Sequence, residues 1–227
     1  MSARHHISLS FRYCIVFLPK GHIHILETDV GTKFYLCATP ESQRYLGISR
    51  LAGPISQHGA NQDIAVLKKL GLSPIIVHGG GKRINNKLSE LNLKSKFIKG
   101  LRVTDGSIIS VVEDVLIQFN KEIRIALRKQ LCEARSVTTK EYNIISIKPE
   151  SEKLGFVGMP NKIKINVLKE IIKTGEVPVV APLGLDEKNQ TFNINADTAA
   201  GAIAKELRAR RLLMISDVEG VLDKEKK

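Results

Sequence analysis

Between Asp63 and Ile215 the sequence alternates short apolar runs with longer segments in which apolar residues recur every three to four positions. The short runs predict buried strands, and the longer segments predict amphipathic helices. Strands are expected at 75–77, 143–147, 177–181 and 212–215, and helices at 63–70, 82–91, 107–130, 163–172 and 196–207. Strands that alternate with helices form mostly parallel sheets covered on both faces. The predicted fold class is therefore α/β, with a mostly parallel open sheet sandwiched by helices.

The composition excludes several classes of protein. With 227 residues, 43% of them apolar, the chain is long enough for one globular domain or two small ones. Its longest apolar run, Cys14 to Leu18, is far shorter than the ~18 to 20 residues of a membrane span, so we expect a soluble protein with no membrane partner. The cysteines Cys14, Cys37 and Cys132 are widely separated. Neither a disulfide framework nor a metal site is predicted from them.

The chain is strongly basic. It contains 35 Lys and Arg residues against 23 Asp and Glu residues, a net charge of +12. Such a field suits nucleic acid, and it equally suits a small anionic substrate or a nucleotide. One locally basic stretch contains Glu90 as its only acid and consists of Lys82, Arg83, Lys87, Lys94, Lys96, Lys99 and Arg102. We interpret this stretch as a solvated face that aids solubility, and we predict no nucleic-acid partner.

The N-terminal part of the chain carries few signals. The first 26 residues contain no Asp or Glu but several Ser and Arg residues, a composition that resembles an organelle transit peptide. A secretory signal is less favoured, because its apolar segment usually has ~7 to 15 residues. From Glu27 to Gln62 no sustained helical or alternating pattern is present.

A triple glycine follows the first clear strand, in the sequence His78-Gly79-Gly80-Gly81, and a predicted helix begins directly after it. Glycines in such a turn let the backbone approach a ligand, and the helix start adds N–H groups and positive potential. The spacing matches neither a Walker A loop nor a dinucleotide fingerprint. The pattern indicates an anion site, with a simple tight turn as the alternative.

Three further segments carry polar residues near the ends of predicted strands. Arg102 lies in a Gly-Leu-Arg-Val-Thr-Asp segment, and its planar guanidinium suits bidentate capture of a carboxylate, although most arginines are simply surface residues. The segment Asn193-Ile194-Asn195-Ala196-Asp197 precedes a helix of small residues. There, Asn195 or Asp197 could cap the helix instead of contacting a ligand. An acidic loop from Ser216 to Asp223 is typical of a segment near a metal-bound nucleotide.

In this order and spacing, the segments at 63–67, 76–81, 100–105, 154–158, 177–182, 193–197 and 217–223 resemble the acetylglutamate kinases of the amino acid kinase family. The resemblance covers roughly 160 of the 227 residues. It implies the amino acid kinase fold and ATP-dependent phosphorylation of N-acetyl-L-glutamate to N-acetyl-L-glutamyl 5-phosphate, a step of arginine biosynthesis. It also implies a homodimer or higher homo-oligomer in the cytoplasm, or in a plastid if the N-terminus is a transit segment.

The resemblance further implies roles for individual residues. Gly80 and Gly81 would bind substrate and donate N–H groups toward the transferring phosphoryl group, and Arg102 and Asn193 would hold the substrate. Asp197 would be the catalytic residue that positions the charged groups. The nucleotide site, for ATP with Mg²⁺, would begin with Asp217, Val218, Glu219, Gly220, Val221 and Leu222. No residue is assigned as a metal ligand.

The sequence departs from the family pattern in two places. The Lys-x-Gly-Gly motif expected before the helix at 63–70 is absent, and Gln57-His58-Gly59-Ala60-Asn61 stands near its place. The chain ends at Lys227, where the family continues into the nucleotide-binding lobe. We therefore divide the chain into an unmatched segment at 1–62, an acyl amino acid-binding and dimerisation lobe at 63–210, and the start of a truncated nucleotide-binding lobe at 211–227.

Two functions remain open from the sequence alone. The first is an acetylglutamate kinase polypeptide, and the second is a catalytically inactive fragment that binds acetylglutamate or forms the dimer. Two missing phosphate-contacting lysines would favour the second, since removing one preorganised donor typically costs ~10²- to 10³-fold in rate. Substrate binding without ATP binding would distinguish the fragment from the kinase.

Overall fold

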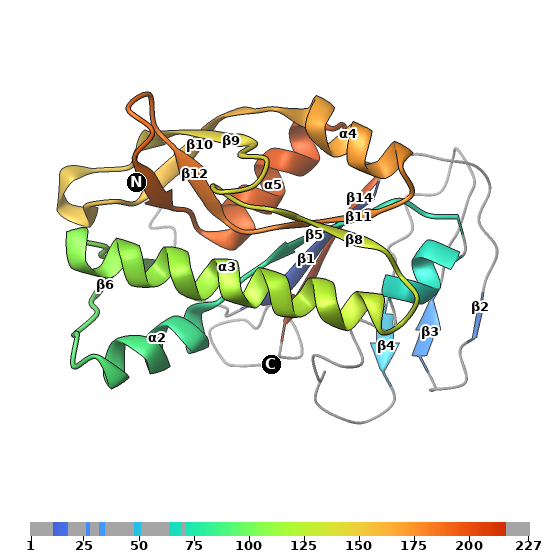
Figure 1. Ribbon diagram of the computed structural model, residues 1–227, viewed down its shortest axis with the longest axis horizontal. Helices are drawn as coiled ribbons and strands as arrows, with labels where there is room; N and C mark the ends of the chain where they lie inside the picture. The colour runs from blue at the N-terminus through green and yellow to red at the C-terminus, as the bar shows by residue number, and fades with distance from the viewer. Residues whose placement is uncertain are drawn as a thin grey trace, which may run out of the picture.

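The computed structural model describes residues 11–17, 26–27, 32–34, 48–50, 64–69 and 71–216. Its main sheet has five strands in the order β14 (Arg211–Ser216), β1 (Phe11–Phe17), β5 (Pro74–His78), β11 (Val177–Val180) and β8 (Ala134–Val137). Strands β5, β11 and β8 pair in parallel, whereas β1 is antiparallel to both of its neighbours. All strands except β1 therefore run in one direction, which confirms the mostly parallel sheet (Figure 1).

A second sheet of four strands adjoins the first. Its order is β10 (Gly158–Ile163), β9 (Ile145–Pro149), β12 (Leu183–Leu185) and β13 (Thr191–Asn193). A 3-10 turn at Glu152–Leu154 precedes β10. Smaller sheets join β2 (Leu26–Glu27), β3 (Thr32–Phe34) and β4 (Ile48–Arg50), and β6 (Phe97–Ile98) with β7 (Leu101–Arg102).

Helices cover both faces of the main sheet, as Figure 1 shows for α3 on one side and α4 and α5 on the other. Their bounds are α2 (Gly81–Glu90), α3 (Gly106–Arg128), α4 (Ile165–Lys173) and α5 (Ala196–Glu206), and residues 64–69 are also helical. Within the described ranges, no helix has the length and apolar character that crossing a membrane requires.

The core follows from the alternation of side chains along β5. Ile75 and Val77 belong to the apolar cluster beneath α4 and α5, whereas Ile76 packs in the cluster beneath α3 with Phe119 and Ile123. All three strand residues are fully buried. Successive strand residues point to opposite faces, and a parallel strand covered on both sides therefore reads as a continuous apolar run. Each such burial contributes about 1.5 to 3 kcal/mol of stability.

The structure corrects several details of the predicted elements. The strand expected at 143–147 is β9, and it belongs to the second sheet. Strand β8 was not predicted, because Arg135 and Ser136 interrupt its apolar pattern. The second sheet was missed for a similar reason, since β10 contains Pro160, Asn161 and Lys162 and has no continuous apolar run. In the N-terminal part, β1, β3 and β4 occur where no strand was expected.

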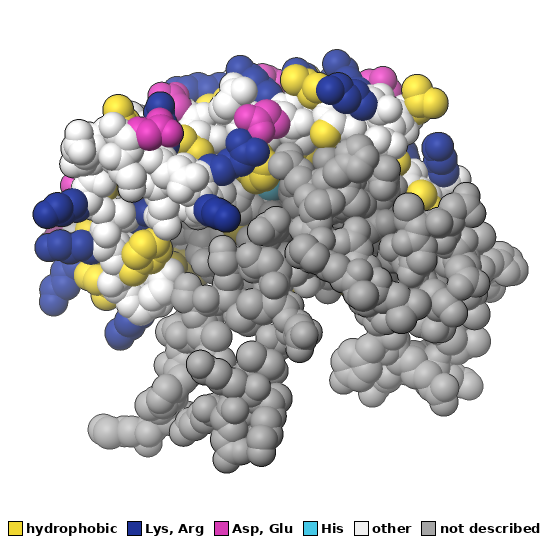
Figure 2. Space-filling model, turned by 90° about the horizontal axis from the view of Figure 1, so that it is seen from below, with side chains coloured by type: hydrophobic (Ala, Val, Ile, Leu, Met, Phe, Trp, Pro, Cys, Tyr) yellow, Lys and Arg dark blue, Asp and Glu magenta, His cyan; other side chains and the backbone are white. Residues whose placement is uncertain are grey.

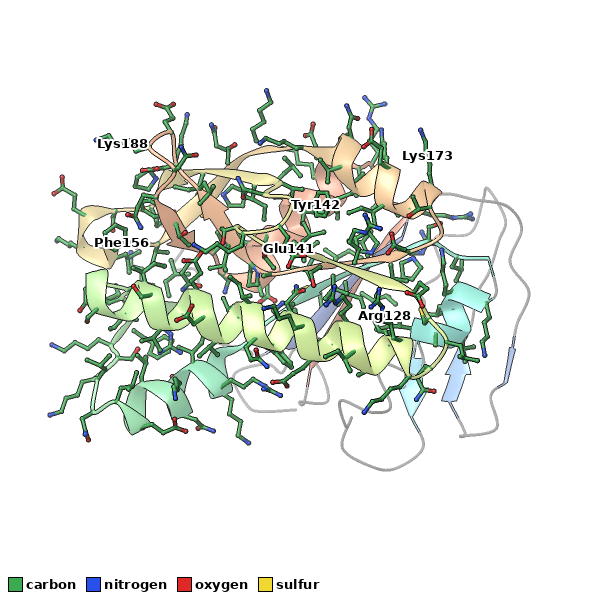
Figure 3. All side chains as sticks on the ribbon, in the orientation of Figure 1. Arg128, Glu141, Tyr142, Phe156, Lys173 and Lys188 are labelled. Carbon is green, nitrogen blue, oxygen red and sulfur yellow. The ribbon has the colours of Figure 1, made fainter. Side chains whose placement is uncertain are left out.

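Gly155 joins the second sheet to the segment that carries Arg102. Thr104 donates its backbone N–H to Leu154 and accepts from the N–H of Phe156, at 2.9 and 2.7 Å. Gly155 lies between these two bonds with φ at +67°, and a Cβ there would overlap the carbonyl oxygen of Thr104. Figure 3 shows Phe156 beside the start of α3. Only glycine fits this position without moving one backbone segment from the other.

We predict that Gly155→Ala destabilises the protein more than Gly175→Ala does. Both glycines have positive φ, but a Cβ at Gly175 meets no atom within 4 Å. Gly175→Ala should therefore cost only the ~1 to 2 kcal/mol of a left-handed alanine, whereas Gly155→Ala adds a backbone clash. Urea unfolding of the two variants would measure this difference, and equal losses of stability would contradict the prediction.

Candidate functional site

A pocket of about 140 Å³ lies at the end of β5 from which α2 starts. In parallel α/β sheets this edge, at the carboxyl ends of the strands, is where ligands bind. The pocket is lined by residues from three predicted segments, among them Gly80, Gly81, Arg102, Asn193 and Asp197. The structure therefore brings together every predicted substrate-binding residue and the predicted catalytic residue. The predicted nucleotide residues Asp217 to Leu222, and the segment at 57–61, lie outside the described residues.

The triple glycine forms the turn between β5 and α2. Gly80 is the N-cap residue, and its carbonyl accepts the first helical hydrogen bond from Ile84 at 2.9 Å. The N–H groups of residues 81–83 have no hydrogen-bond partner among the described residues, and the first turn of α2 contains no acid. These free donors and the helix dipole favour an anion beside Gly80 and Gly81. The turn is tight as well, since a Cβ at Gly80 would lie 2.5 Å from Leu116 Cδ2.

Arg102 is buried, with 6% of its surface exposed. Its guanidinium donates to Ser95 Oγ at 2.5 Å, to Asn85 Oδ1 at 2.7 Å and, more weakly, to the Gly81 carbonyl at 3.4 Å. The ring of Phe97 lies 4.7 Å from the guanidinium carbon. Desolvation lowers the pKa of Arg102 from its ordinary value, but an arginine stays charged in proteins. Arg102 is thus an inward-facing cation, not the surface arginine of the alternative interpretation.

The backbone around Arg102 is fixed on both sides. Lys99 and Gly100, with φ of +49° and +81°, form the turn between β6 and β7. Thr104 donates its hydroxyl to the Arg102 carbonyl at 3.0 Å. Asp105 then caps α3 by accepting from the N–H groups of Ser107 and Ile108, both at 3.0 Å. Hydrogen bonds from the Ser107 side chain and the Ile108 backbone lower the pKa of the Asp105 carboxyl.

The two asparagines of the third segment have different places. Asn195 is the N-cap of α5 and accepts from the Thr198 N–H at 3.0 Å, so the capping interpretation is right for this residue. Asn193 ends β13, where its N–H donates to the Phe156 carbonyl at 2.9 Å. Asp197 lies in the first turn of α5 and lines the pocket. Asn193, Asn195 and Asp197 all line the pocket, so Asn195 combines the capping of α5 with a place at the pocket.

Sequence reasoning missed a buried polar network beneath the glycine turn. The ring of His78 bonds the Gly79 carbonyl through Nδ1 at 2.9 Å, and its Nε2 lies 3.1 Å from Asn120 Nδ2. Asn120 also donates to the Val179 carbonyl at 2.8 Å. Since Asn120 Nδ2 is a donor, Nε2 must accept and Nδ1 must carry the proton. The network joins β5, α3 and β11 directly behind the anion turn.

The basic stretch is mostly a solvated face, as its sequence suggested. Figure 2 shows Lys and Arg side chains at the end of the molecule that carries α2 and β6 in Figure 1. Arg83 pairs with Glu122 at 2.8 Å, and Lys87 pairs with Glu90 at 2.9 Å. Arg102 differs from these residues because it is buried. Among the described residues, no group of three or more His, Cys, Asp or Glu side chains could hold a metal ion.

Comparison with known proteins defines the class. The sequence pattern of the amino acid kinase family matches residues 58–227, and the chain belongs to this family. A protein of Streptococcus mutans UA159, smu.665, has a similar structure with a TM-score of 0.69 and 29% identity, over 72% of this chain and 68% of that one. N-acetylglutamate synthase from Neisseria gonorrhoeae, solved with coenzyme A and N-acetyl-glutamate, has a TM-score of 0.60 at 21% identity over 67% and 36% of the two chains. This second likeness concerns the fold alone.

Within the family, the chain is similar to acetylglutamate kinases, as its motifs predicted. The acetylglutamate kinase of Pelagibacter ubique (strain HTCC1062) is 66% identical over 166 residues, which cover 73% of this chain and 58% of that protein. That of Granulibacter bethesdensis (strain ATCC BAA-1260 / CGDNIH1) is 45% identical over 80% and 64% of the two chains. That of Rhodospirillum rubrum (strain ATCC 11170) is 37% identical over 92% and 73%. The chain thus spans about three fifths of the length of the first two relatives.

We predict that His78 makes the protein less stable as the pH falls below neutrality. Burial lowers the pKa of His78 from 6.5 to about 4, the charge of Arg83 lowers it as well, and the bond to Gly79 partly offsets both. The stabilising effect of the neutral ring is present above pH 6.5 and is lost as the pH falls toward 4, because the unfolded chain takes up a proton that the folded chain does not. Between pH 7 and pH 5 the loss should be about 2 kcal/mol.

Urea unfolding of the wild type and of His78→Gln at several pH values measures this effect. All other titrating groups are shared, so the difference between the two pH profiles isolates His78. The wild type should show the steeper loss of stability between pH 7 and pH 5, and parallel profiles would contradict the prediction.

Proposed function

We propose that the pocket binds N-acetyl-L-glutamate and that the chain acts as an acetylglutamate kinase. The reaction transfers the γ-phosphoryl group of ATP to the side-chain carboxylate, giving N-acetyl-L-glutamyl 5-phosphate and ADP on the route to arginine. The observation that carries the proposal is a buried Arg102, unpaired with any acid of the described residues, beside a glycine turn that offers free N–H donors. The similarity to acetylglutamate kinases supports the choice of substrate.

Arg102 and Asn193 would hold the carboxylate of the substrate that does not react. A guanidinium offers two parallel N–H groups to a carboxylate, and these charge-assisted bonds are strong and directional. Asn193 lines the same pocket, on a strand end fixed by Phe156. Binding one carboxylate at this end leaves the side-chain carboxylate free to face the glycine turn.

The glycine turn would then serve the reacting end. Phosphoryl transfer needs positioning and charge stabilisation more than covalent help from the protein. The N–H groups near Gly80 and Gly81 would stabilise negative charge on the transferring group, and Asp197 would position the charged groups. Bound ATP with Mg²⁺ supplies the phosphoryl group and neutralises phosphate charge, and Mg²⁺ is commonly held by phosphates with only one or two carboxylates. Asp217 to Leu222 would begin the nucleotide site.

The same proposal includes the organisation of the protein. Residues 63–210 would form the acyl amino acid-binding and dimerisation lobe, and residues 211–227 would begin the nucleotide-binding lobe. The assembly would be a homodimer or larger homo-oligomer in the cytoplasm. The basic face would favour association with two anionic ligands.

We predict that Arg102→Ala weakens binding of N-acetyl-L-glutamate by at least about 30-fold, because truncating one partner of a buried charge pair costs about 2 kcal/mol or more. Arg128→Ala is the matched control, since Arg128 forms an exposed pair with Glu133 far from the pocket lining. Isothermal titration of the 227-residue chain measures both variants. Unchanged affinity in Arg102→Ala would remove this residue from the substrate pocket.

A titration with ATP and Mg²⁺ and an assay for ADP test nucleotide binding and phosphoryl transfer separately. Acetylglutamate-dependent formation of ADP would support a phosphotransferase. Binding of acetylglutamate without binding of ATP would instead support a substrate-binding fragment.

A further inference from the structure

We propose that Asn85 is a positioning and specificity-determining residue, which together with Ser95 holds the Arg102 guanidinium through neutral oxygens and so reserves its charge for an anionic ligand. The inference rests on the proposed function, in which Arg102 captures a substrate carboxylate. It extends that function to residues that do not line the pocket.

The two acceptors approach the guanidinium from different elements. Asn85 lies in the middle of α2 and its Oδ1 is 2.7 Å from Nη2, whereas Ser95 lies before β6 and its Oγ is 2.5 Å from Nη1. These acceptors on the two terminal nitrogens, together with the weaker bond from Nη2 to the Gly81 carbonyl at 3.4 Å, fix the plane of the group. The Phe97 ring, 4.7 Å from the guanidinium carbon, adds an apolar neighbour. One N–H of Nη1 and the Nε–H make no hydrogen bond with the described residues, and Arg102 lines the pocket.

The partners of Arg102 differ in charge from those of Arg83, Arg128 and Arg135. Arg83, Arg128 and Arg135 each form an ion pair with a glutamate, at 2.8, 3.1 and 2.5 Å. No acid of the described residues pairs with Arg102, although it is the most deeply buried of the four. A buried charge without an opposite charge is costly. The site thus keeps a cation that a ligand carboxylate can neutralise, and an amide rather than a carboxylate at position 85 preserves this state.

The substitution Asn85→Asp tests this directly. Aspartate has nearly the same shape and keeps an oxygen facing Nη2, but it adds a negative charge beside Arg102. The new carboxylate would pair with the guanidinium and compete with the carboxylate of the ligand. We expect the affinity for N-acetyl-L-glutamate to fall at least about 10-fold, since hydrogen bonds between charged partners are stronger than those to a neutral amide.

Asn86→Asp is the matched control. Asn86 is the next residue of α2 and, like Asn85, is exposed, but it makes no hydrogen bond with Arg102 and lines a groove between α2 and α3 whose lining does not include Arg102. It makes the same change in net charge and in helix propensity. The affinity of Asn86→Asp should stay within about twofold of the wild type, because its carboxylate does not contact the Arg102 guanidinium and its charge is screened by solvent and salt. Ser95→Ala should give a smaller loss than Asn85→Asp, since it removes an acceptor without adding charge.

A measurement of thermal stability tests the role of Asn85 without any ligand. The carboxylate introduced by Asn85→Asp would stabilise the fold through Arg102, so the thermal midpoint of this variant should exceed that of Asn86→Asp by about 2 °C or more. This advantage should vanish when Arg102→Gln is added to both variants. Weak binding together with a raised midpoint excludes misfolding as the cause.

The outcomes separate the two proposals. If the wild-type chain does not bind N-acetyl-L-glutamate, the proposed function fails, and the thermal comparison still decides whether Arg102 lacks a counter-charge. If the wild type binds but Asn85→Asp and Asn86→Asp have equal affinities, the role of Asn85 is overturned. It is also overturned if the effect of Asn85→Asp on the midpoint persists without Arg102.

Discussion

A guanidinium that is buried beside a pocket, with neutral groups around it, is the interaction on which the rest of this structure depends. Such a charge stays desolvated only in rigid surroundings, because mobile side chains would admit water and screen it. The structure supplies that rigidity from outside the pocket. Thr104 and Asp105 fix the backbone after Arg102, and the glycine turn is backed by His78 and Asn120. The pocket is thus held by parts of the chain that never line it.

The alternation of apolar runs and amphipathic segments predicted β5, β11 and β14 of the main sheet and the helices that cover it, but not β1 or β8. A parallel strand such as β5 is buried on both faces, so the apolar run Ile75, Ile76 and Val77 clearly predicts it. Strand β8 and the second sheet carry Arg135 and Pro160 in their interiors, and their identity depends on pairing with distant strands. Such pairing cannot be deduced from local pattern, since edge strands tolerate polar residues and proline.

In the candidate site, too, some residues could be predicted from local sequence motifs and others depend on contacts between distant parts of the chain. Its pocket residues lie in short motifs with glycine, arginine and asparagine, and their types alone suggested an anion-binding site. The residues that position them were not found, because their contacts are distant in sequence: Asn85 reaches Arg102 across 17 positions and Asn120 reaches His78 across 42. From the sequence alone, Asn85 and Asn120 cannot be distinguished from other polar residues of a helix, because only the structure shows which side chains they contact.

The close backbone contact between Gly155 and Thr104 has a consequence for the formation of the pocket. It joins segments about fifty residues apart, and contacts of such separation require closure of a long loop before they form. The segment that carries Arg102 is therefore held in its final place only when these two parts of the chain have met. A ligand that needs Arg102 in this place would bind only the folded arrangement, and would therefore stabilise the folded protein relative to the unfolded chain.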